Sequence, residues 1–390
     1  MTLAGMDIAV IGGGIGGLAA ALALRVRGAD VRIYEQADAL REYGAGIQVS
    51  PNGLRVIEAL GLGQGFRAVA RRGQAVRLRD GLGRGRTLLR LDLDKAGPEQ
   101  DYHFVHRADL ISLLARSACE AGVQVRLLQK ATTILPGPRP SAHMSHGDTV
   151  RADLIIGADG LHSVLRPVLN GVYAPFFTGQ VAWRAIVPNR FDHPDEAHVH
   201  MGPGRHLVSY PLRDGESINL VAVEERRGWA AEGWSHEDDP DILRHAFAGF
   251  GPAARALLQD VTNPGLWGLF RHKVATCWHG PGVALLGDAA HPTLPFMAQG
   301  ANMALEDAWV LAQSLETGLE KGLPLYQARR HRRVCKVVEA ANQNAWKYHL
   351  RGPLLRGAGH LGLRVMNKIA PERMLHQFDW IYGHDVTRVE

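Results

Sequence analysis

The stretch DIAVIGGGIGGLAAALALRVRGADVRIYEQ, Asp7 to Gln36, decides the fold of this chain. Two short apolar runs flank a glycine-rich loop and a longer apolar run, which predicts a strand, a helix and a second strand. In such a loop Gly12 allows a tight turn, Gly14 lets backbone N–H groups approach a pyrophosphate, and Gly17 lets the helix pack on the strand. The stretch predicts a dinucleotide-binding domain and leaves open whether the dinucleotide is a nicotinamide or a flavin.

Two further features of this unit fit a dinucleotide. Glu35 ends the second predicted strand, where a carboxylate can hold ribose hydroxyl groups. The N-terminus of the predicted helix adds partial positive charge that favours a phosphate. The alternative, a glycine-rich turn without a ligand, leaves this combination unexplained.

Bulk composition narrows the class of protein. The 390 residues exceed what one ordinary core supports and predict two domains, and the apolar and charged fractions of 46% and 21% are typical of a globular protein. The net charge of +5 fits either a solvated surface or attraction of anionic substrates. We interpret the basic cluster Arg329, Arg330, Arg332 and Arg333 as a solvated helix face and expect no nucleic-acid partner.

Cysteine and hydropathy patterns predict a cytoplasmic protein. The three cysteines lie far apart without CxxC spacing, which argues against a disulfide scaffold and a thiolate zinc site. The apolar run Ile8 to Leu24 is too rich in glycine for a membrane span. Histidines 193, 198, 200 and 206 form only a loose group, so no metal is expected.

The middle of the chain changes in character. The segment Ala75 to Leu93 alternates polar and apolar residues and predicts hairpin strands. From Val181 the runs VAWRAIVP, AHVHMG, RHLVSYPL and SINLVAV predict a mixed or antiparallel sheet. GVALLGDAAH then predicts another buried strand, followed by a long helix from Gly300 to Gly318.

Two later segments carry a family resemblance. DLIIGADGLHSVLR, from Asp153, and GVALLGDAAHPTLPFMAQGANMALEDA, from Gly282, follow the GxGxxG loop and the arginine of VHRADL in a fixed order. This order resembles the class A flavoprotein monooxygenases of the para-hydroxybenzoate hydroxylase fold. QVAWRAIVP and FDWIYGHDV look like salicylate hydroxylase and 3-hydroxybenzoate 6-hydroxylase relatives, and the pair His206 and Tyr210 resembles that of 3-hydroxybenzoate 6-hydroxylase and 6-hydroxynicotinate 3-monooxygenase relatives.

The resemblance implies an α/β architecture in which an FAD-binding Rossmann-like domain of the glutathione-reductase type is interrupted by a mixed β-sheet domain for the substrate. We expect residues 1–74, 101–178 and 268–345 to form the FAD-binding domain and residues 75–100 and 179–267 to form the substrate domain. A helical C-terminal tail is expected over residues 346–390.

The resemblance implies FAD as the cofactor and names residues for its outer parts. Asp288 is expected to accept a hydrogen bond from a ribityl hydroxyl group, and Gly287 to let the flavin chain pass. Arg107 and Arg41 are expected near the pyrophosphate or the rest of the cofactor, with a surface salt bridge as the alternative for both.

Other residues are implied around the flavin ring. Asp159 and Gly160 are expected to serve FAD and a visiting nicotinamide, although they also fit an ordinary turn. The backbone of Gly300, Ala301 and Asn302 would present a helix N-terminus to flavin N1 and the C2 carbonyl, which stabilises negative charge on the reduced ring.

The implied reaction is reduction of FAD by NADH or NADPH, reaction with O2, and transfer of OH from a flavin C4a-hydroperoxide to a small phenolic or hydroxypyridine carboxylic acid. A phenolic ring reacts better once its hydroxyl group is deprotonated, so the site needs a base. His206 and Tyr210 are four apart on one strand and share a face. In the relatives such a histidine accepts the proton and the tyrosine positions the substrate.

Two more residues complete the expected substrate site. Pro295 matches a family proline whose carbonyl faces the substrate ring, and Gln48 is either a substrate contact or a loop hydrogen-bonder. For His206 and Tyr210 the alternative is two ordinary sheet residues.

Three functions stay open: this hydroxylation, a flavin monooxygenase on a non-phenolic substrate (epoxidation, urate-type or alicyclic hydroxylation), and a non-catalytic carrier of the same fold. Whether the chain forms a homodimer is also open.

Overall fold

A computed structural model describes residues 3–40, 45–97, 100–226, 228, 237–344 and 348–388. The first apolar runs form a six-stranded sheet in the order β18-β19-β12-β1-β2-β8, parallel except for β18. Its strands are β1 (Asp7–Ile11), β2 (Asp30–Tyr34), β8 (Gln124–Arg126), β12 (Leu154–Gly157), β18 (His279–Gly280) and β19 (Val283–Leu285). The predicted strand-helix-strand unit is confirmed.

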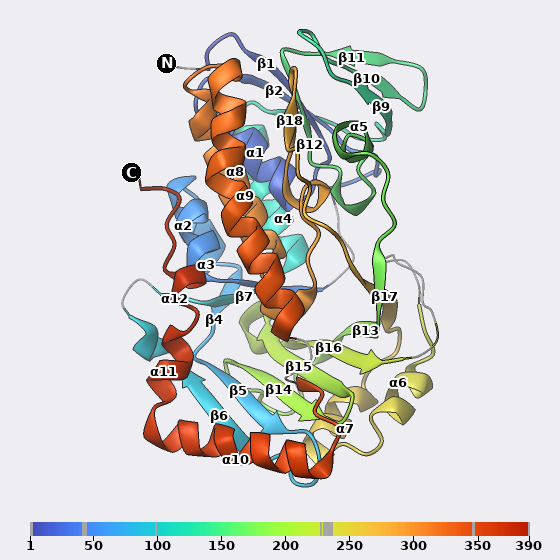
Figure 1. Ribbon diagram of the computed structural model, residues 1–390, viewed down its shortest axis with the longest axis vertical. Coiled ribbons are helices and arrows are strands. Elements are labelled where there is room, and N and C mark those ends of the chain that lie inside the picture. The colour runs from blue at the N-terminus through green and yellow to red at the C-terminus, as the bar shows by residue number, and fades with distance from the viewer. Residues whose placement is uncertain are drawn as a thin grey trace.

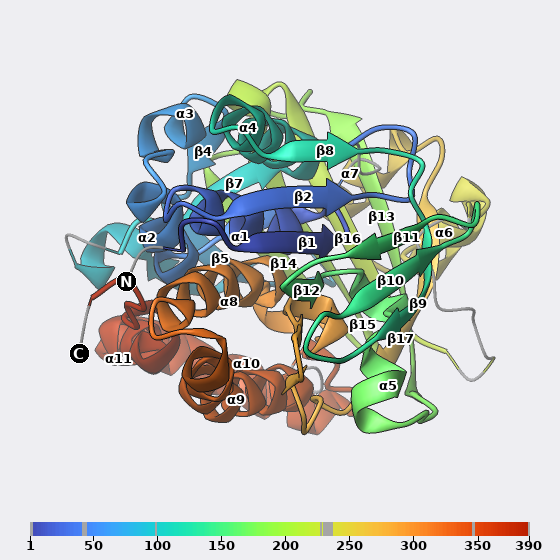
Figure 2. The same ribbon diagram turned by 90° about the horizontal axis from the view of Figure 1, so that it is seen from above.

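Four long helices accompany this sheet: α1 (Ile15–Arg25), α4 (Arg107–Glu120), α8 (Gly300–Leu315) and α9 (Leu319–Asn344). Helix α1 packs against both α4 and α8, and nearly all its side chains are buried because they are apolar on every side. Figure 2 shows β8, β2, β1 and β12 side by side, with α8 and α9 below them and α4 beyond β8. Helix α9 lies along α8 and extends toward the second sheet (Figure 1).

The second sheet has seven strands in the order β17-β13-β16-β15-β14-β5-β6. Its strands are β5 (Ala75–Asp80), β6 (Thr87–Asp92), β13 (Phe176–Pro188), β14 (Glu196–Gly202), β15 (Arg205–Leu212), β16 (Ser217–Glu225) and β17 (Gly265–Arg271). Only the β14–β5 pair is parallel, so the predicted mixed sheet is confirmed. Because strands from 75–100 and 179–267 share this sheet, it supports the proposed division into domains.

One face of the second sheet is a closed core. Trp183 and Leu207 on this face pack against helices α6 (Pro240–Ala246) and α7 (Pro252–Gln259) through Phe247 and Leu258. The other face meets the first domain, where Tyr210 packs against Phe104 of β7. Strand alternation therefore divides the side chains into a core set and a set that faces the cofactor-binding half.

Smaller elements join these layers. Strands β3 (Gly46–Val49), β4 (Ala70–Arg72) and β7 (His103–His106) form one three-stranded sheet, and β9 (Ala131–Leu135), β10 (Ser141–Met144) and β11 (Thr149–Arg151) form another. Helices α2 (Pro51–Ala59) and α3 (Gly63–Arg67) lie between β3 and β4 in sequence, and α5 (Arg166–Asn170) follows β12. The fold class predicted from the sequence, an α/β chain with an inserted sheet and a helical end, is confirmed.

The C-terminal helices are α10 (Pro353–Ile369), α11 (Pro371–His376) and α12 (Asp379–Tyr382). The predicted start of this tail, Trp346, lies outside the described residues. Helices α10 and α11 pack on β6, whereas α12 packs on α2, so the tail touches both halves of the molecule. Figure 1 shows α10 along the lower edge of the second sheet.

A buried charge cluster lies between α8 and α9. Arg330 is fully buried and pairs with Glu306 and with Asp307, the latter at 2.7 Å. His291 lies 2.5 Å from the other oxygen of Asp307. The expectation that Arg330 lies on a solvated helix face is therefore wrong, because two buried carboxylates of α8 require a cation beside them.

Candidate functional site

Four separate segments converge at the carboxyl ends of β1, β12 and β19. Ile11 pairs with Gly157, and Gly157 pairs with Leu285, so the loops that follow these strands are neighbours. The turn η2 (Gly160–His162) packs against the turn η4 (Gly287–Ala289). A Cβ added to Gly300 would lie 4.0 Å from Asp288 Oδ1, which places the start of α8 beside this cluster.

The glycines of the first loop have different tasks. Gly12 has φ +108, and a Cβ there would lie 2.3 Å from the carbonyl oxygen of Ala158. A Cβ on Gly17 would lie 2.0 Å from the carbonyl oxygen of Gly12. Gly14 precedes α1 in an extended conformation without a side-chain cap. Only glycine fits at positions 12 and 17, and the N-terminus of α1 is left open to a ligand.

Glu35 folds back onto this loop. Its carboxylate accepts hydrogen bonds from the backbone N–H of Gly13 at 2.6 Å and of Ala37 at 2.8 Å. These bonds fix the carboxylate at the end of β2, beside the loop, where a ribose of a bound dinucleotide lies in this type of fold.

Asp159 and Gly160 supply an observation that points to a ligand. Asp159 Oδ2 accepts a hydrogen bond from Val164 N–H at 2.8 Å, whereas Oδ1 is buried and has no hydrogen-bond partner among the described residues. Burial raises the pKa of this carboxyl group. Gly160 has φ +72, and a Cβ there would meet nothing within 4 Å. A buried acceptor without a partner beside open space fits a hydroxyl donor of a cofactor.

The N-terminus of α8 is open at its first turn. Gln299 precedes the helix without capping it by its side chain, and Ala298 has φ +52. The Asn302 side chain is committed elsewhere, since it accepts from Ser50 N–H and donates to the carbonyl groups of Gln48 and Ala298. Gly300 and Ala301 can therefore present only backbone groups to a ligand, and Asn302 contributes through its backbone.

Arg107 begins α4 and lies near Asp288. Burial lowers the pKa of Arg107, and the carboxylate of Asp288 opposes this shift. The two residues come from segments that lie far apart in the sequence, and both border the site. Arg41, the other arginine expected at the cofactor, lies outside the described residues.

The opposite wall is the inner face of the second sheet. His206 and Tyr210 of β15 lie opposite Val223 and Asn219 of β16, so all four share this face. Arg184 of β13 lies opposite Val221, in the row between those two pairs. At about 3.3 Å per residue, His206 and Tyr210 are about 13 Å apart along the strand, with Val208 on the same face between them.

His206 is a neutral base held among aromatic rings. Its ring centroid lies 5.9 Å from that of Phe296 and 5.2 Å from that of Tyr348. Burial, followed by the neighbouring His349, lowers the pKa of His206 well below its ordinary value. Phe296 follows Pro295 in the turn η5 (Pro295–Met297), so the predicted proline lies close to His206.

Tyr210 lies at the other end of the face. Its ring stacks on Phe104 with centroids 5.0 Å apart. Burial raises the pKa of Tyr210, and the neighbouring Arg184, Gln48 and Asn219 oppose this shift. Gln48 Oε1 accepts a hydrogen bond from the Tyr102 hydroxyl at 2.5 Å. Because Gln48 is among the groups that act on the Tyr210 hydroxyl, these two predicted residues are neighbours.

Arg184 brings a positive charge to the centre of this wall. Its guanidinium carbon lies 4.7 Å from the centroid of the Trp267 ring. Burial lowers the pKa of Arg184 to about 10, with Tyr210 opposing the shift, so the group remains charged at neutral pH.

Sequence reasoning missed several of these neighbours. Asn219 accepts a hydrogen bond from Gly46 N–H at 2.6 Å, and His349 lies 2.7 Å from His206. Both contacts join segments that lie far apart in the chain, by 143 residues for His206 and His349 and by 173 for Gly46 and Asn219. No local motif signals either contact. Arg184 was visible from the sequence as part of the predicted strand VAWRAIVP, but only the register with β16 shows which face of the sheet it takes.

No group of three or more histidine, cysteine or acidic side chains within the described ranges is arranged to hold a metal ion. Among the helices of the described ranges, none is both long and apolar enough to cross a membrane.

Together, a dinucleotide-type loop, an open helix N-terminus and a facing wall that carries an imidazole and a guanidinium group are typical of flavin-dependent oxidoreductases. A family model described as FAD binding domain matches residues 5–341, so the chain belongs to that family. It is a flavoprotein monooxygenase, and the resemblance inferred from the sequence is confirmed.

Relatives and solved structures agree with this class. The chain is 36% identical over 367 residues to 3-amino-4-hydroxybenzoate 2-monooxygenase of Streptomyces cremeus, covering 88% of each chain. It is 34% identical to 3-hydroxybenzoate 6-hydroxylase of Polaromonas naphthalenivorans, covering 98% of this chain and 97% of that one. The structure of Klebsiella pneumoniae HpxO complexed with FAD and uric acid matches with a TM-score of 0.83 and 26% identity over 96% of each chain.

Proposed function

We propose that this protein hydroxylates a small aromatic carboxylic acid that carries a ring hydroxyl group, of the benzoate or pyridine type, and consumes NADH or NADPH and O2. The main observation in support is the inner sheet face, on which a neutral histidine, a partly buried arginine and a buried tyrosine share one wall. The relatives named for hydroxybenzoates give the same class of substrate.

We propose the following contacts for FAD. Gly12, Gly14 and Gly17 shape the loop for the pyrophosphate, and Glu35 holds the ribose. Arg107 and Asp288 hold the pyrophosphate side and the ribityl chain, and Gly287 leaves room for the chain. Asp159 and Gly160 supply the buried acceptor and the open space beside it, and the backbone of Gly300, Ala301 and Asn302 faces the pyrimidine edge. Bound FAD supplies the redox chemistry that links NAD(P)H and O2 to the ring.

The residues of the sheet face act on the substrate. His206 accepts the proton of the ring hydroxyl group, because a buried neutral imidazole has a free lone pair at neutral pH. Tyr210 and Gln48 position the ring from the other end, and the carbonyl group of Pro295 borders it. The aromatic side chains Phe104 and Phe296 exclude water from this space.

We propose that Arg184 binds the substrate carboxylate. The charge lies between the base and the tyrosine and is partly buried, so a carboxylate there gains a charge-assisted hydrogen bond. This assignment separates the acid group from the ring hydroxyl and orients the ring between them.

A substrate screen tests the proposal. Hydroxybenzoates, salicylate, hydroxynicotinates and urate are each added to the FAD-loaded protein, and NADH and NADPH oxidation is followed together with product mass. We expect coupled hydroxylation of at least one phenolic acid. Coupled turnover of urate alone favours the non-phenolic alternative, for which the uric acid complex of HpxO is the supporting observation. If none of these compounds stimulates NAD(P)H oxidation, both the phenolic proposal and the non-phenolic alternative are contradicted.

The cofactor contacts have their own test. Asp288→Ala is expected to lower FAD retention after gel filtration, because a ribityl hydrogen bond is lost. Asp148→Ala, which changes an exposed carboxylate on the distant β10–β11 turn, is the matched control. Full FAD occupancy in the Asp288 variant removes this assignment.

We further propose that the protein works in the cytoplasm and that two copies associate. Three cysteines without disulfide bonds support the first point. Exposed apolar side chains on α10, including Leu354, Leu361, Val365 and Ile369, support the second. Light scattering of the purified protein measures the mass, and a monomer contradicts the association.

A further inference from the structure

A chain of hydrogen bonds leads from His206 to the protein surface. His206 Nδ1 lies 2.7 Å from His349 Nε2, and His349 Nδ1 lies 2.9 Å from Glu225 Oε1. Both histidines are 3% exposed, whereas the Glu225 side chain is 27% exposed. Glu225 also accepts from Arg351, whose side chain is 67% exposed. The chain therefore crosses from the substrate wall to solvent through three titratable groups.

The carboxylate at the end of the chain fixes the direction of each hydrogen bond. A carboxylate only accepts, so the proton of neutral His349 is on Nδ1 and points to Glu225. Nε2 of His349 is then an acceptor, and the proton of neutral His206 must be on Nδ1. This leaves Nε2 of His206 without a proton, and none of the described residues hydrogen-bonds to it. The free lone pair is the one a substrate hydroxyl group needs.

We propose that His349 and Glu225 form a proton relay that holds His206 in the Nδ1–H tautomer and carries the substrate proton to solvent. The proposal rests on the proposed function, since it takes His206 as the base. His349 and Glu225 touch neither substrate nor cofactor and are positioning and relay residues.

The relay balances in three transfers. The O–H bond of the ring hydroxyl breaks and its proton bonds to His206 Nε2, which leaves a phenolate. The Nδ1 proton of His206 moves to His349 Nε2, and the Nδ1 proton of His349 moves to Glu225 Oε1. Both imidazoles end neutral with the opposite tautomer, and the negative charge has moved from Glu225 to the ring. The reverse sequence reprotonates the product hydroxyl and restores the first state.

The surroundings favour neutral imidazoles. Burial lowers the pKa of His349, with Glu225 opposing the shift and Arg351 and Arg205 adding to it. Burial raises the pKa of Glu225, but Arg351 and His349 oppose it, and the net shift is downward. Tyr348 packs on the His206 ring, and burial raises its pKa, so it stays neutral. Phe296, which also packs on His206, carries no titratable group.

The tautomer test needs neither cofactor turnover nor a substrate. Protein labelled with 15N at histidine is observed at pH 7.5, and the His206 and His349 signals are assigned from the His206→Gln and His349→Gln variants. We expect the Nδ1–H tautomer at both rings, with a strongly deshielded proton on His206 Nδ1. An Nε2–H tautomer of His206 in the wild-type protein overturns the proposal, even if the protein hydroxylates phenolic acids.

The variants extend this test to the relay. His349→Gln and Glu225→Gln are each compared with wild-type protein, with 3-hydroxybenzoate as the probe. Because the partner that sets the tautomer is lost, we expect kcat to fall about 10- to 100-fold with KM little changed and the pH profile shifted upward. Glu225→Gln serves as a second variant in case His349→Gln fails to fold. It removes only the charge of a partly exposed side chain at the solvent end of the hydrogen-bond chain.

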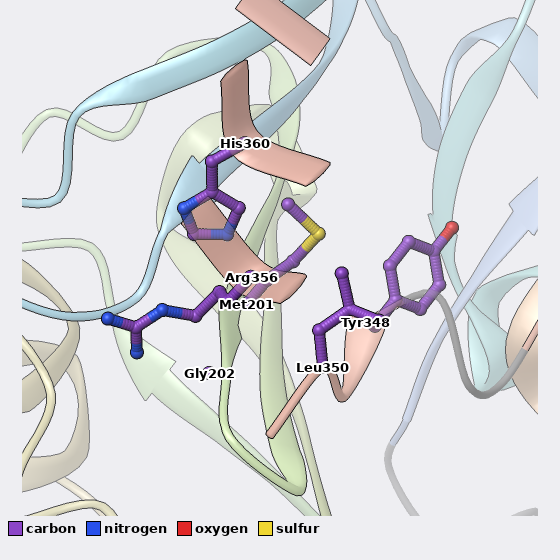
Figure 3. A pocket seen from close by; sticks show the side chains of 6 residues that line it. All are labelled: Met201, Gly202, Tyr348, Leu350, Arg356 and His360. Carbon is purple, nitrogen blue, oxygen red and sulfur yellow. The ribbon is translucent and has the colours of Figure 1, made fainter. Parts of the chain in front are cut away.

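A nearby histidine is the matched control. Tyr348 and Leu350, the sequence neighbours of His349, line a small pocket with His360 (Figure 3). His360 lies 3.7 Å from Asp80 and is not part of the relay, so His360→Gln should retain the pH profile. Equal pH profiles in wild type, His349→Gln and Glu225→Gln overturn the relay. If 3-hydroxybenzoate is not turned over at all, the proposed function fails for this ring, while the tautomer result still decides the inference.

Discussion

The molecule buries two sets of charged and titratable groups, and they are built in opposite ways. Between α8 and α9, every charge has a partner: Arg330 pairs with Glu306 and Asp307, and Arg333 adds two bonds to Glu306 at 2.8 and 2.9 Å. On the inner face of the second sheet, Arg184 lies against an aromatic ring and His206 keeps one nitrogen without a bond from the described residues.

The difference separates stability from function. In the first cluster the opposite charges lie within hydrogen-bond distance, so the cost of burial is offset inside the protein. In the second set burial shifts the pKa of His206, Tyr210 and Arg184 away from their ordinary values, which is typical of groups that act on a ligand. The first cluster also supports the cofactor side of the site, because Asp307 accepts from Gly287 N–H at 3.2 Å and so fixes the turn that carries Asp288.

Arg330→Met breaks the first cluster and has the largest expected effect. The variant leaves Glu306 and Asp307 buried without their shared cation, which costs about 3–5 kcal/mol of unfolding free energy. Denaturant unfolding measures the change. The control is Arg332→Met, which removes an exposed arginine two residues away in sequence. Its unfolding free energy should stay within about 0.5 kcal/mol of wild type. Similar midpoints for the two variants contradict the assignment of the cluster to stability.

Acid tests the same cluster with the chain intact. Burial raises the pKa of Glu306, but Arg330 and Arg333 more than reverse this and lower it to about 2, from 4.5. A group whose folded pKa is lowered stabilises the protein above its unfolded pKa and loses this contribution as the pH falls. We expect a loss on the order of 3 kcal/mol between about pH 4.5 and pH 2.

The Arg330→Met variant sharpens this prediction. Without Arg330, only Arg333 holds the Glu306 carboxylate, so stability should fall less across that interval than it does in the wild-type protein. Urea midpoints at a series of pH values compare the two proteins, and parallel curves would show that Glu306 is not held by Arg330.

His206→Gln tests the second set, the groups on the inner face of the second sheet. Loss of the base should lower coupled hydroxylation about a hundredfold while the unfolding free energy stays within about 1 kcal/mol. His200→Gln is the control, because His200 is equally buried in the same sheet but pairs with Leu207, on the opposite face. A loss of stability without a loss of rate would assign His206 to the core instead.

The sequence was most informative where function depends on local order. The loop from Gly12 to Gly17 and the strand with His206 and Tyr210 are short motifs that were predicted from neighbouring residues, whereas the turn with Asp288 was assigned through the family resemblance. The basic cluster misled, because Arg330 faces α8 and nothing near it in sequence shows the two carboxylates. The His206–His349 contact was also hidden, since it depends on how a segment 143 residues away returns to the sheet.

Arg184→Gln has the smallest expected effect and tests which end of the substrate lies at the centre of the wall. If Arg184 binds a carboxylate, the loss of one charge-assisted hydrogen bond should raise KM about 10-fold, equivalent to about 1.4 kcal/mol, with little change in kcat. Arg226→Gln is the control: Arg226 also lies over a tryptophan, Trp183, whose side chain belongs to the opposite face. The readout is the KM for the acid and for its amide. A wild-type enzyme that prefers the acid, beside a variant that does not, supports the assignment, whereas an unchanged preference means that the carboxylate lies elsewhere and Arg184 serves the cofactor edge.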